Sequence, residues 1–170
     1  TRRPAEVLCL PYFLGEKSPI HDPDLRGVFA GMHLGHTRAD LYRAVLEAIA
    51  FGFRHHVDVF GEIGIPLTRV MITNGGSTST LWKQIHADVL GHEMLPVRGH
   101  PGASLGVAVI AAIGVGSLDD WSDAARFVSL EMPFRPDPDR RRVYDEAYAT
   151  WRELGSAVTP VSHALARQNR

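Results

Sequence analysis

Residues 68–91 read TRVMITNGGSTSTLWKQIHADVLG, and this stretch decides the fold. A short apolar run at 70–72 is followed by Gly75 and Gly76, and then by a hydroxyl-rich, amphipathic segment that ends at Gly91. This order predicts a strand, a tight turn and a helix. Glycines let the backbone approach a ligand closely, and the first N–H groups of a helix favour anionic or carbonyl acceptors. The stretch is therefore typical of a nucleotide site, although a diglycine before a helix can also be a plain turn.

The segments before this stretch predict a strand, a loop and a long helix. Residues 7–14 have the pattern of a buried extended segment, and glycines and prolines mark a loop over 15–35. The sequence TRAD at 37–40 is a capping-box-like helix start, because its hydroxyl and its carboxylate can both satisfy first-turn N–H groups. Apolar residues at helical spacing predict that this helix runs to about 61–64.

Three more elements are predicted after the diglycine stretch. Residues 94–98 read as a second short strand, and GASLG at 102–106 opens an apolar helix of small residues. We expect this helix to be buried on most sides, with its glycines permitting close packing. A polar helix over 139–154 follows. Because helices and strands alternate, the strands should pair in parallel with helices packed on the sheet, which defines an α/β fold. We expect one domain over 1–156 and a polar C-terminal tail over 157–170.

The composition limits the classes of function. A chain of 170 residues with 45% hydrophobic and 22% charged residues is typical of a soluble globular protein. The net charge of −1 argues against a surface for nucleic acid or for an anionic membrane. The single cysteine, Cys9, excludes an internal disulfide and fits a reducing, cytoplasmic location. The apolar run at 107–115 is too short to span a membrane. The chain starts at Thr1, without Met, and soon enters a strand-like run, so we expect a segment of a longer protein.

Three blocks of sequence resemble a known family. They are LPYFLGEKSPIHDPDLRG at 10–27, GVFAGMHLGHTRADLYRAVLE at 27–47 and NGGSTSTLWKQIHADVLG at 74–91. The third block is similar to the motif Gly-Gly-Gly-Ala-x-Ser-x-x-Trp-x-Gln-x-x-Ala-Asp-x-x-Gly. In combination they resemble the C-terminal part of the FGGY-family carbohydrate kinases, closest to the xylulokinase-like pentulose kinases. The resemblance extends from about Leu8 to Phe134.

The resemblance implies an ATP-dependent kinase that uses Mg²⁺ and phosphorylates a hydroxyl of a small sugar or polyol. It also implies an actin-like, ribonuclease H-like ATPase domain with ATP in a cleft between two domains. In that family the diglycine loop lies against the adenosine, so Gly75 and Gly76 would face the base and the ribose. Ser79 or Thr80 would offer a polar contact, and Trp82 would pack beneath.

The sequence departs from the family pattern at three positions. Asn74 stands where a first glycine is usual, Ser77 where alanine is usual, and Lys17 where arginine is usual. Lysine keeps the charge of arginine but not its bidentate geometry.

Several parts of the family's active site lie outside this chain. The Asp base, the phosphate-binding loops and most sugar contacts precede the region that the resemblance covers. No residue of this chain is therefore predicted to be catalytic, and we expect the isolated chain to be inactive. A cleft face without its partner domain would be exposed, which could favour a homodimer.

Other residues that could carry chemistry have simpler interpretations. The loop residues His33 and His36 lack a clean ligand pattern, and no metal site is predicted. Glu47 and Asp88 are interpreted as hinge, cap or salt-bridge residues rather than as bases. Lys83 is expected on a solvated helix face.

The spacing of the helix that begins at 37–40 also predicts which of its side chains are buried. Val45 and Ile49 should point into the core, whereas Arg43 should be solvated.

The sequence leaves two alternative functions open. Besides a kinase fragment, the sequence permits a non-enzymatic, actin-like module that binds a nucleotide for regulation or assembly. It also permits a structural domain without a ligand.

Overall fold

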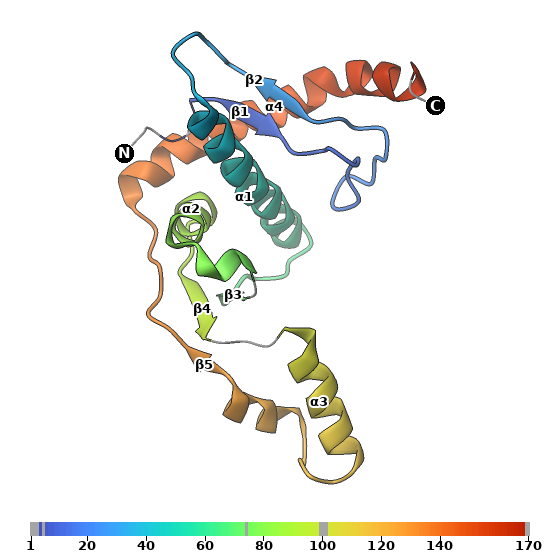
Figure 1. The fold of residues 1–170 in the computed structure, drawn as a ribbon, viewed down its shortest axis with the longest axis vertical. Coiled ribbons are helices and arrows are strands. Elements are labelled where there is room, and N and C mark those ends of the chain that lie inside the picture. Colours follow the sequence, from blue (N-terminus) through green and yellow to red (C-terminus); the bar gives the residue numbers. More distant parts are fainter. Residues whose placement is uncertain (1–3, 5, 74, 99–101, 169–170) are drawn as a thin grey trace.

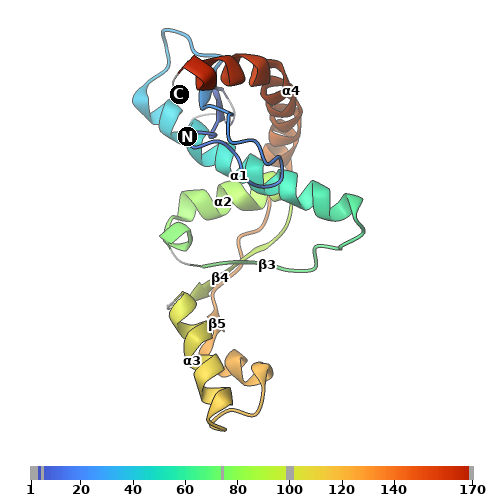
Figure 2. The same ribbon diagram turned by 90° about the vertical axis from the view of Figure 1, so that its right-hand side faces the viewer.

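The computed structural model describes residues 4, 6–73, 75–98 and 102–168. Its elements in chain order are β1 (Leu8–Leu10), β2 (Val28–Ala30), α1 (Arg38–Glu62), β3 (Val70–Ile72), the 3-10 helix η1 (Gly75–Thr78), α2 (Thr80–Leu90), β4 (Met94–Arg98), α3 (Ala103–Gly114), the 3-10 helix η2 (Trp121–Phe127), β5 (Ser129–Leu130) and α4 (Pro138–Gln168). Figures 1 and 2 show a larger part, formed by α1, α2, α4, β1 and β2, and a smaller part, formed by α3, η2 and β5. We call these parts the body and the lobe. Strands β3 and β4 lie between them (Figure 2).

Helix α1 begins and ends where the sequence predicts. Thr37 is its N-cap, and the Asp40 carboxylate accepts hydrogen bonds from the N–H (2.7 Å) and the hydroxyl (2.8 Å) of Thr37. Such reciprocal contacts satisfy groups that the first turn of a helix leaves without partners. The helix buries Phe51 deeply, whereas Val45 and Ile49 are half-buried.

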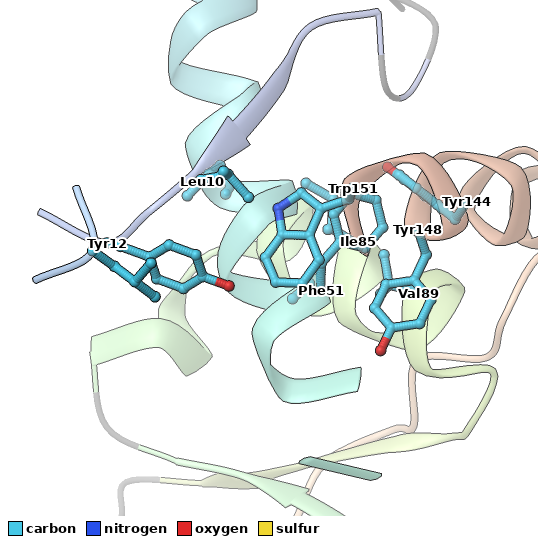
Figure 3. Close-up of a cluster of buried hydrophobic side chains, with 11 residues drawn as sticks. Leu10, Tyr12, Phe51, Ile85, Val89, Tyr144, Tyr148 and Trp151 are labelled. Atoms are coloured by element: carbon cyan, nitrogen blue, oxygen red, sulfur yellow. The ribbon is translucent and has the colours of Figure 1, made fainter. Parts of the chain in front are cut away.

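An aromatic core joins α1, α2, α4 and β1 (Figure 3). The Phe51 ring lies 5.8 Å from the rings of both Tyr148 and Trp151, measured between centroids. The Trp151 indole N–H donates a hydrogen bond of 2.7 Å to the Cys9 carbonyl, so α4 is tied to β1. The buried members of this core are Leu10, Tyr12, Leu25, Leu46, Ala50, Phe51, Ile85, Val89, Tyr144, Tyr148 and Trp151. Large aromatic side chains dominate the energetics of such cores.

The strands form two small sheets. The predicted parallel pairing is confirmed for β3 and β4, with Val70 opposite Met94, and β5 adds to β4 in the antiparallel direction. Strand β2 pairs antiparallel with β1 in a separate sheet. The prediction of an uninterrupted loop over 15–35 is therefore wrong. A strand of three residues has too short a pattern to be distinguished from a loop without knowledge of its pairing partner.

The lobe helix α3 differs most from its prediction. Over Ala103–Gly114, which the structure describes fully, Val109 is the one buried residue. The side chains of Val107 and Ile110 are 66% and 57% exposed. Apart from the backbone of α3 itself, no atom of the part of the chain that the structure describes lies within 4 Å of the position of a Cβ at Gly106 or Gly114. The expected burial on most sides and the expected close packing at these glycines are therefore wrong, because the structure places no neighbouring element on those faces.

The C-terminal helix is longer than predicted. Helix α4 continues past 139–154 to Gln168, and its last part buries Ser162 and Ala166. The Nε2 atom of His163 lies 2.7 Å from a carboxylate oxygen of Asp22 and thereby ties this end of α4 to the loop after β1. The boundary between domain and tail at 156 stays a prediction. No helix within the described residues is long and apolar enough to cross a lipid bilayer.

Candidate functional site

The diglycine turn connects the end of β3 to the start of α2. Gly75 opens η1, and the Thr78 hydroxyl donates a hydrogen bond of 2.8 Å to the Gly75 carbonyl. Ser79 is the N-cap of α2, because its hydroxyl oxygen accepts the Trp82 N–H at 3.2 Å. Gly91 ends α2 in the left-handed conformation that glycine adopts readily. The strand, the turn and the helix of the predicted nucleotide motif are thus confirmed as structural elements.

The two glycines have different surroundings. A Cβ added at Gly76 would lie 2.7 Å from Cζ3 of Trp82, so the indole ring leaves no room for a side chain there. At Gly75 a Cβ would meet no atom of the described residues within 4 Å, its chain neighbours aside. The indole N–H of Trp82 donates a hydrogen bond of 3.3 Å to the Leu46 carbonyl on α1. Trp82 therefore supports the turn from below, while the backbone at Gly75 is open to an approaching ligand.

An apolar pocket of about 240 Å³ lies beside the turn, between β3, α1 and α2. Gly76 and Trp82 belong to its wall, together with Phe53, Met71 and His86. His86 is buried, and its Nδ1 lies 2.9 Å from the Trp82 carbonyl. Burial lowers the pKa of His86, so the imidazole is neutral at pH 7. The pocket thus offers an apolar surface without a charged group, which suits a flat, uncharged ring.

The structure brings the predicted site residues together. Gly75, Gly76, Ser79 and Thr80 all lie in the turn and the first turn of α2, and Thr80 is exposed. Asn74 lies outside the described residues. Whether these residues contact a nucleotide stays a prediction. Sequence reasoning missed that Phe53, Met71 and His86 line the adjacent pocket. The spacing of Trp82 and His86, one helical turn apart, was a signal for a shared face.

Glu47 forms a buried polar cluster rather than a free base. Its carboxylate accepts hydrogen bonds from the Arg43 guanidinium (2.6 Å) and from the Tyr144 hydroxyl (2.8 Å). Arg43 also donates to the Tyr144 hydroxyl at 3.1 Å. The interpretation of Glu47 as a salt-bridge residue is confirmed. The prediction of a solvated Arg43 is wrong, because α4 supplies a buried tyrosine that the pattern of α1 alone does not show.

Asp88 also has a structural role, as predicted. One of its oxygens accepts the backbone N–H of Asp137 and the amide of Gln84, both at 2.8 Å. Its other oxygen lies 3.2 Å from the Arg140 guanidinium. Asp88 therefore holds the chain where it enters α4. Lys83 was expected to be solvated but is buried, and its ammonium lies 4.8 Å from the centroid of a phenyl ring, that of Phe134.

Metal-binding residues do not gather in the described parts of the chain. Among those residues, no group of three or more His, Cys, Asp or Glu side chains is placed to hold a metal ion.

The fold and the motif define the class of protein. The model for the C-terminal domain of the FGGY family of carbohydrate kinases matches residues 1–115. The chain belongs to this family. The predicted fold class is confirmed, because its structural neighbours are FGGY kinases with the actin-like ATPase fold.

Xylulose kinases and glycerol kinases are among its relatives. The xylulose kinase from Rhodospirillum rubrum superposes with a TM-score of 0.80 at 40% identity, covering 94% of this chain and 32% of that one. The xylulose kinase of Lactococcus lactis subsp. lactis (strain IL1403) is 31% identical over 166 residues, which are 96% of this chain and 33% of the relative. The glycerol kinase of Citrifermentans bemidjiense is 37% identical over 148 residues, which are 86% of this chain and 30% of the relative. The chain thus spans about a third of the length of these relatives.

Proposed function

We propose that this chain is the nucleotide-side domain of an ATP-dependent carbohydrate kinase that phosphorylates a hydroxyl of a pentulose or a related sugar or polyol. Membership of the FGGY family supports this function. The relatives named xylulose kinase and glycerol kinase support a small polyhydroxylated substrate. We also propose that the domain extends over 1–156, that the enzyme acts in the cytoplasm, and that it can form a homodimer.

The observation that carries the proposal is the open diglycine turn beside the apolar pocket. In this arrangement the backbone of Gly75 and Gly76 lies against the adenosine, and the pocket offers an uncharged surface for the base. The Ser79 oxygen caps α2, and no acceptor within the described residues takes its hydroxyl proton, which a ligand can therefore accept. Thr80 presents a second hydroxyl at the exposed start of the same helix. These residues fit a nucleoside.

The residues of the turn suit the nucleoside rather than the phosphates. The sequence GGSTST at 75–80 carries no charge. When bound, Mg²⁺ neutralises charge on the phosphates during transfer. We propose that the base for the attacking hydroxyl and most sugar contacts belong to parts of the kinase outside this chain.

The nucleotide assignment is tested with Gly75→Val. A Cβ at this position meets no atom of the described residues beyond its chain neighbours, so the branched side chain fills the space over the turn and should weaken ADP binding about tenfold or more, equivalent to about 1.4 kcal/mol. Calorimetric titration of this chain with ADP measures the effect. The same substitution at Gly106, on the exposed face of α3, is the control and should leave the affinity unchanged. An unchanged affinity in Gly75→Val would contradict the assignment. Gly76→Val is less decisive, because it also displaces Trp82.

The enzymatic assignment is tested by an ADP-release assay with a panel of pentuloses and polyols. Catalysis in such kinases requires closure of two domains around both substrates. This chain alone should therefore bind ADP weakly, and it should form no ADP from ATP when a sugar is added. A kinase that contains this domain together with the remaining two thirds typical of its relatives should turn over with Mg²⁺. Sugar-dependent turnover by the purified chain alone would refute the division of the site between domains.

A further inference from the structure

A second pocket, of about 250 Å³, lies between the loop after β1, helix α1 and helix α4. It shares no residue with the pocket beside Gly76. Leu25 and Trp151 supply apolar surface, while Tyr12, His55 and Arg152 each bring a polar group from a different element. These elements are far apart in the sequence, so the combination exists only in the folded body.

Tyr12 is a buried residue whose hydroxyl belongs to the lining of the pocket. The residue is 4% exposed, and its hydroxyl makes no hydrogen bond within the described residues. Figure 3 shows this hydroxyl pointing toward the side of the core occupied by Trp151. Burial, and then the nearby Glu16 carboxylate, raise the pKa of Tyr12 to about 12. The group therefore keeps its proton at neutral pH and can donate it to a ligand.

Two nitrogen-bearing side chains face the same pocket. Arg152 donates one hydrogen bond, of 3.3 Å, to the Tyr148 hydroxyl, and it forms no ion pair within the described residues. The His55 imidazole makes no hydrogen bond within the described residues. Burial, and then the charge of Arg152, lower the pKa of His55, against the opposing influence of Asp58 and Glu62. Most of the five N–H donors of Arg152 thus remain unused.

The carboxylates of Glu16, Asp58 and Glu62 act on these groups from outside the lining of the pocket. Asp58 accepts the Tyr148 hydroxyl at 2.6 Å, and Glu16 accepts the backbone N–H groups of Lys17 and Ser18. Neither acidic residue lines the pocket. The pocket therefore presents donors in excess of acceptors, which is the chemistry that recognises an oxyanion.

The wall of the pocket is fixed before any ligand binds. Glu16 and Asp22 exchange two backbone hydrogen bonds, of 2.8 and 2.7 Å, across the loop. The Asp22 carboxylate is tied to His163 on α4 at 2.7 Å. A preformed wall lowers the ordering cost of binding.

We propose that this pocket binds the phosphate monoester of a small sugar or polyol. The phosphate oxygens meet the donors of Tyr12, His55 and Arg152, and the C–H face of the ligand packs on the apolar floor. The rim hydroxyls of Ser156 and Thr159 direct their protons to the carbonyls of Arg152 and Gly155, so their oxygens can accept from ligand hydroxyls. The site is separate from the proposed nucleotide turn and does not depend on it.

Calorimetric titration of this chain with ribose 5-phosphate, with tryptophan fluorescence recorded in parallel, tests the proposal. Saturable binding is expected. Arg152→Gln removes a charge-assisted contact and should weaken binding about tenfold. Tyr12→Phe keeps the ring in the core and removes just the hydroxyl, so it should weaken binding about threefold. Arg142→Gln is the matched control on the same helix, because Arg142 is exposed like Arg152 but does not line the pocket, and it should bind as the wild type does.

The alternatives give distinct outcomes. Ribose should not saturate at the same concentrations, and inorganic phosphate should bind more weakly than ribose 5-phosphate. Equal affinities for ribose and ribose 5-phosphate would overturn the anion assignment, and equal affinities for phosphate and ribose 5-phosphate would overturn the sugar assignment. Wild-type affinity in both Tyr12→Phe and Arg152→Gln would overturn the location. Gly75→Val should leave this binding intact, and its loss in that variant would place the phosphate at the nucleotide turn instead.

Discussion

The body and the lobe contain similar apolar residues but bury them to very different extents. In the body, α1, α2 and α4 enclose an aromatic core in which Phe51 and Trp151 are almost inaccessible to solvent. In the lobe, α3 consists almost entirely of small and aliphatic residues, yet Val107 and Ile110 are mostly exposed. The apolar sequence of a helix therefore indicates that the helix needs a packing partner, but it does not indicate where that partner lies. An exposed apolar face of this kind is typical of an interaction surface.

The sharpest test of this comparison pairs a truncation in each part. Phe51→Ala removes a ring that contacts Tyr144, Tyr148 and Trp151 and should lower the free energy of unfolding by about 3–5 kcal/mol. Ile110→Ala removes an exposed side chain and should change it by less than about 0.5 kcal/mol. Urea denaturation of both variants measures the two values. A large loss for Ile110→Ala would show that α3 is covered in solution and would break the comparison.

The sequence predicts the elements whose signals are local. Helix α1 has its capping residues at 37–40, and α2 has Ser79 at its start and Gly91 at its end. The parallel pair β3 and β4 follows from alternation with helices. Strand β2, the exposure of α3 and the burial of Lys83 were missed. Strand β2 and the burial of Lys83 depend on partners that are distant in the sequence. The exposure of α3 reflects the absence of a packing partner on its apolar faces within the described residues.

In the candidate site, too, the residues of a local motif could be predicted from the sequence, whereas residues contributed by distant elements could not. The diglycine turn is a local motif, so Gly75, Gly76, Ser79 and Thr80 could be selected from the sequence. The pocket beside it needs Phe53 from α1, which local patterns do not connect to the turn. The second pocket combines a loop and two helices and has no local motif.

The attachment of α4 to α2, at the point where the chain returns from the lobe to the body, is tested with Asp88→Ala. This change removes the acceptor for the Asp137 N–H and the partner of Arg140, so the start of α4 loses its attachment to α2. The expected loss is about 2–3 kcal/mol, because the hydrogen bonds involve a charged, buried group. Hydrogen exchange should accelerate at 138–142 and stay unchanged in α3. Equal acceleration in α3 would show that lobe and body unfold as one unit.

A smaller effect is expected from Arg43→Ala within the body. Glu47 keeps its hydrogen bond from Tyr144 but loses its cation, which should cost about 1–2 kcal/mol. Arg142→Ala is the matched control, because it removes an exposed arginine and should cost close to nothing. Thermal unfolding at neutral pH compares the two. Equal small losses would mean that Arg43 contributes no more than a solvated arginine does, and that the Tyr144 hydroxyl alone satisfies Glu47.

The smallest effect is expected at the far end of α4, where His163→Ala removes the partner of Asp22. Burial, the largest single influence, raises the pKa of Asp22, but the contact with His163 and the backbone N–H groups of Asp24 and Leu25 together hold it below the ordinary value of 3.8. A lowered pKa in the folded state stabilises the fold above the ordinary value, and this contribution disappears as the pH falls through the lowered pKa. The variant should therefore be less stable than the wild type at neutral pH, with a difference that vanishes in acid. Carboxyl NMR titration should show the pKa of Asp22 rising toward its ordinary value in the variant. An unchanged pKa would mean that His163 does not hold the loop, and the end of α4 would then resemble the lobe more than the body.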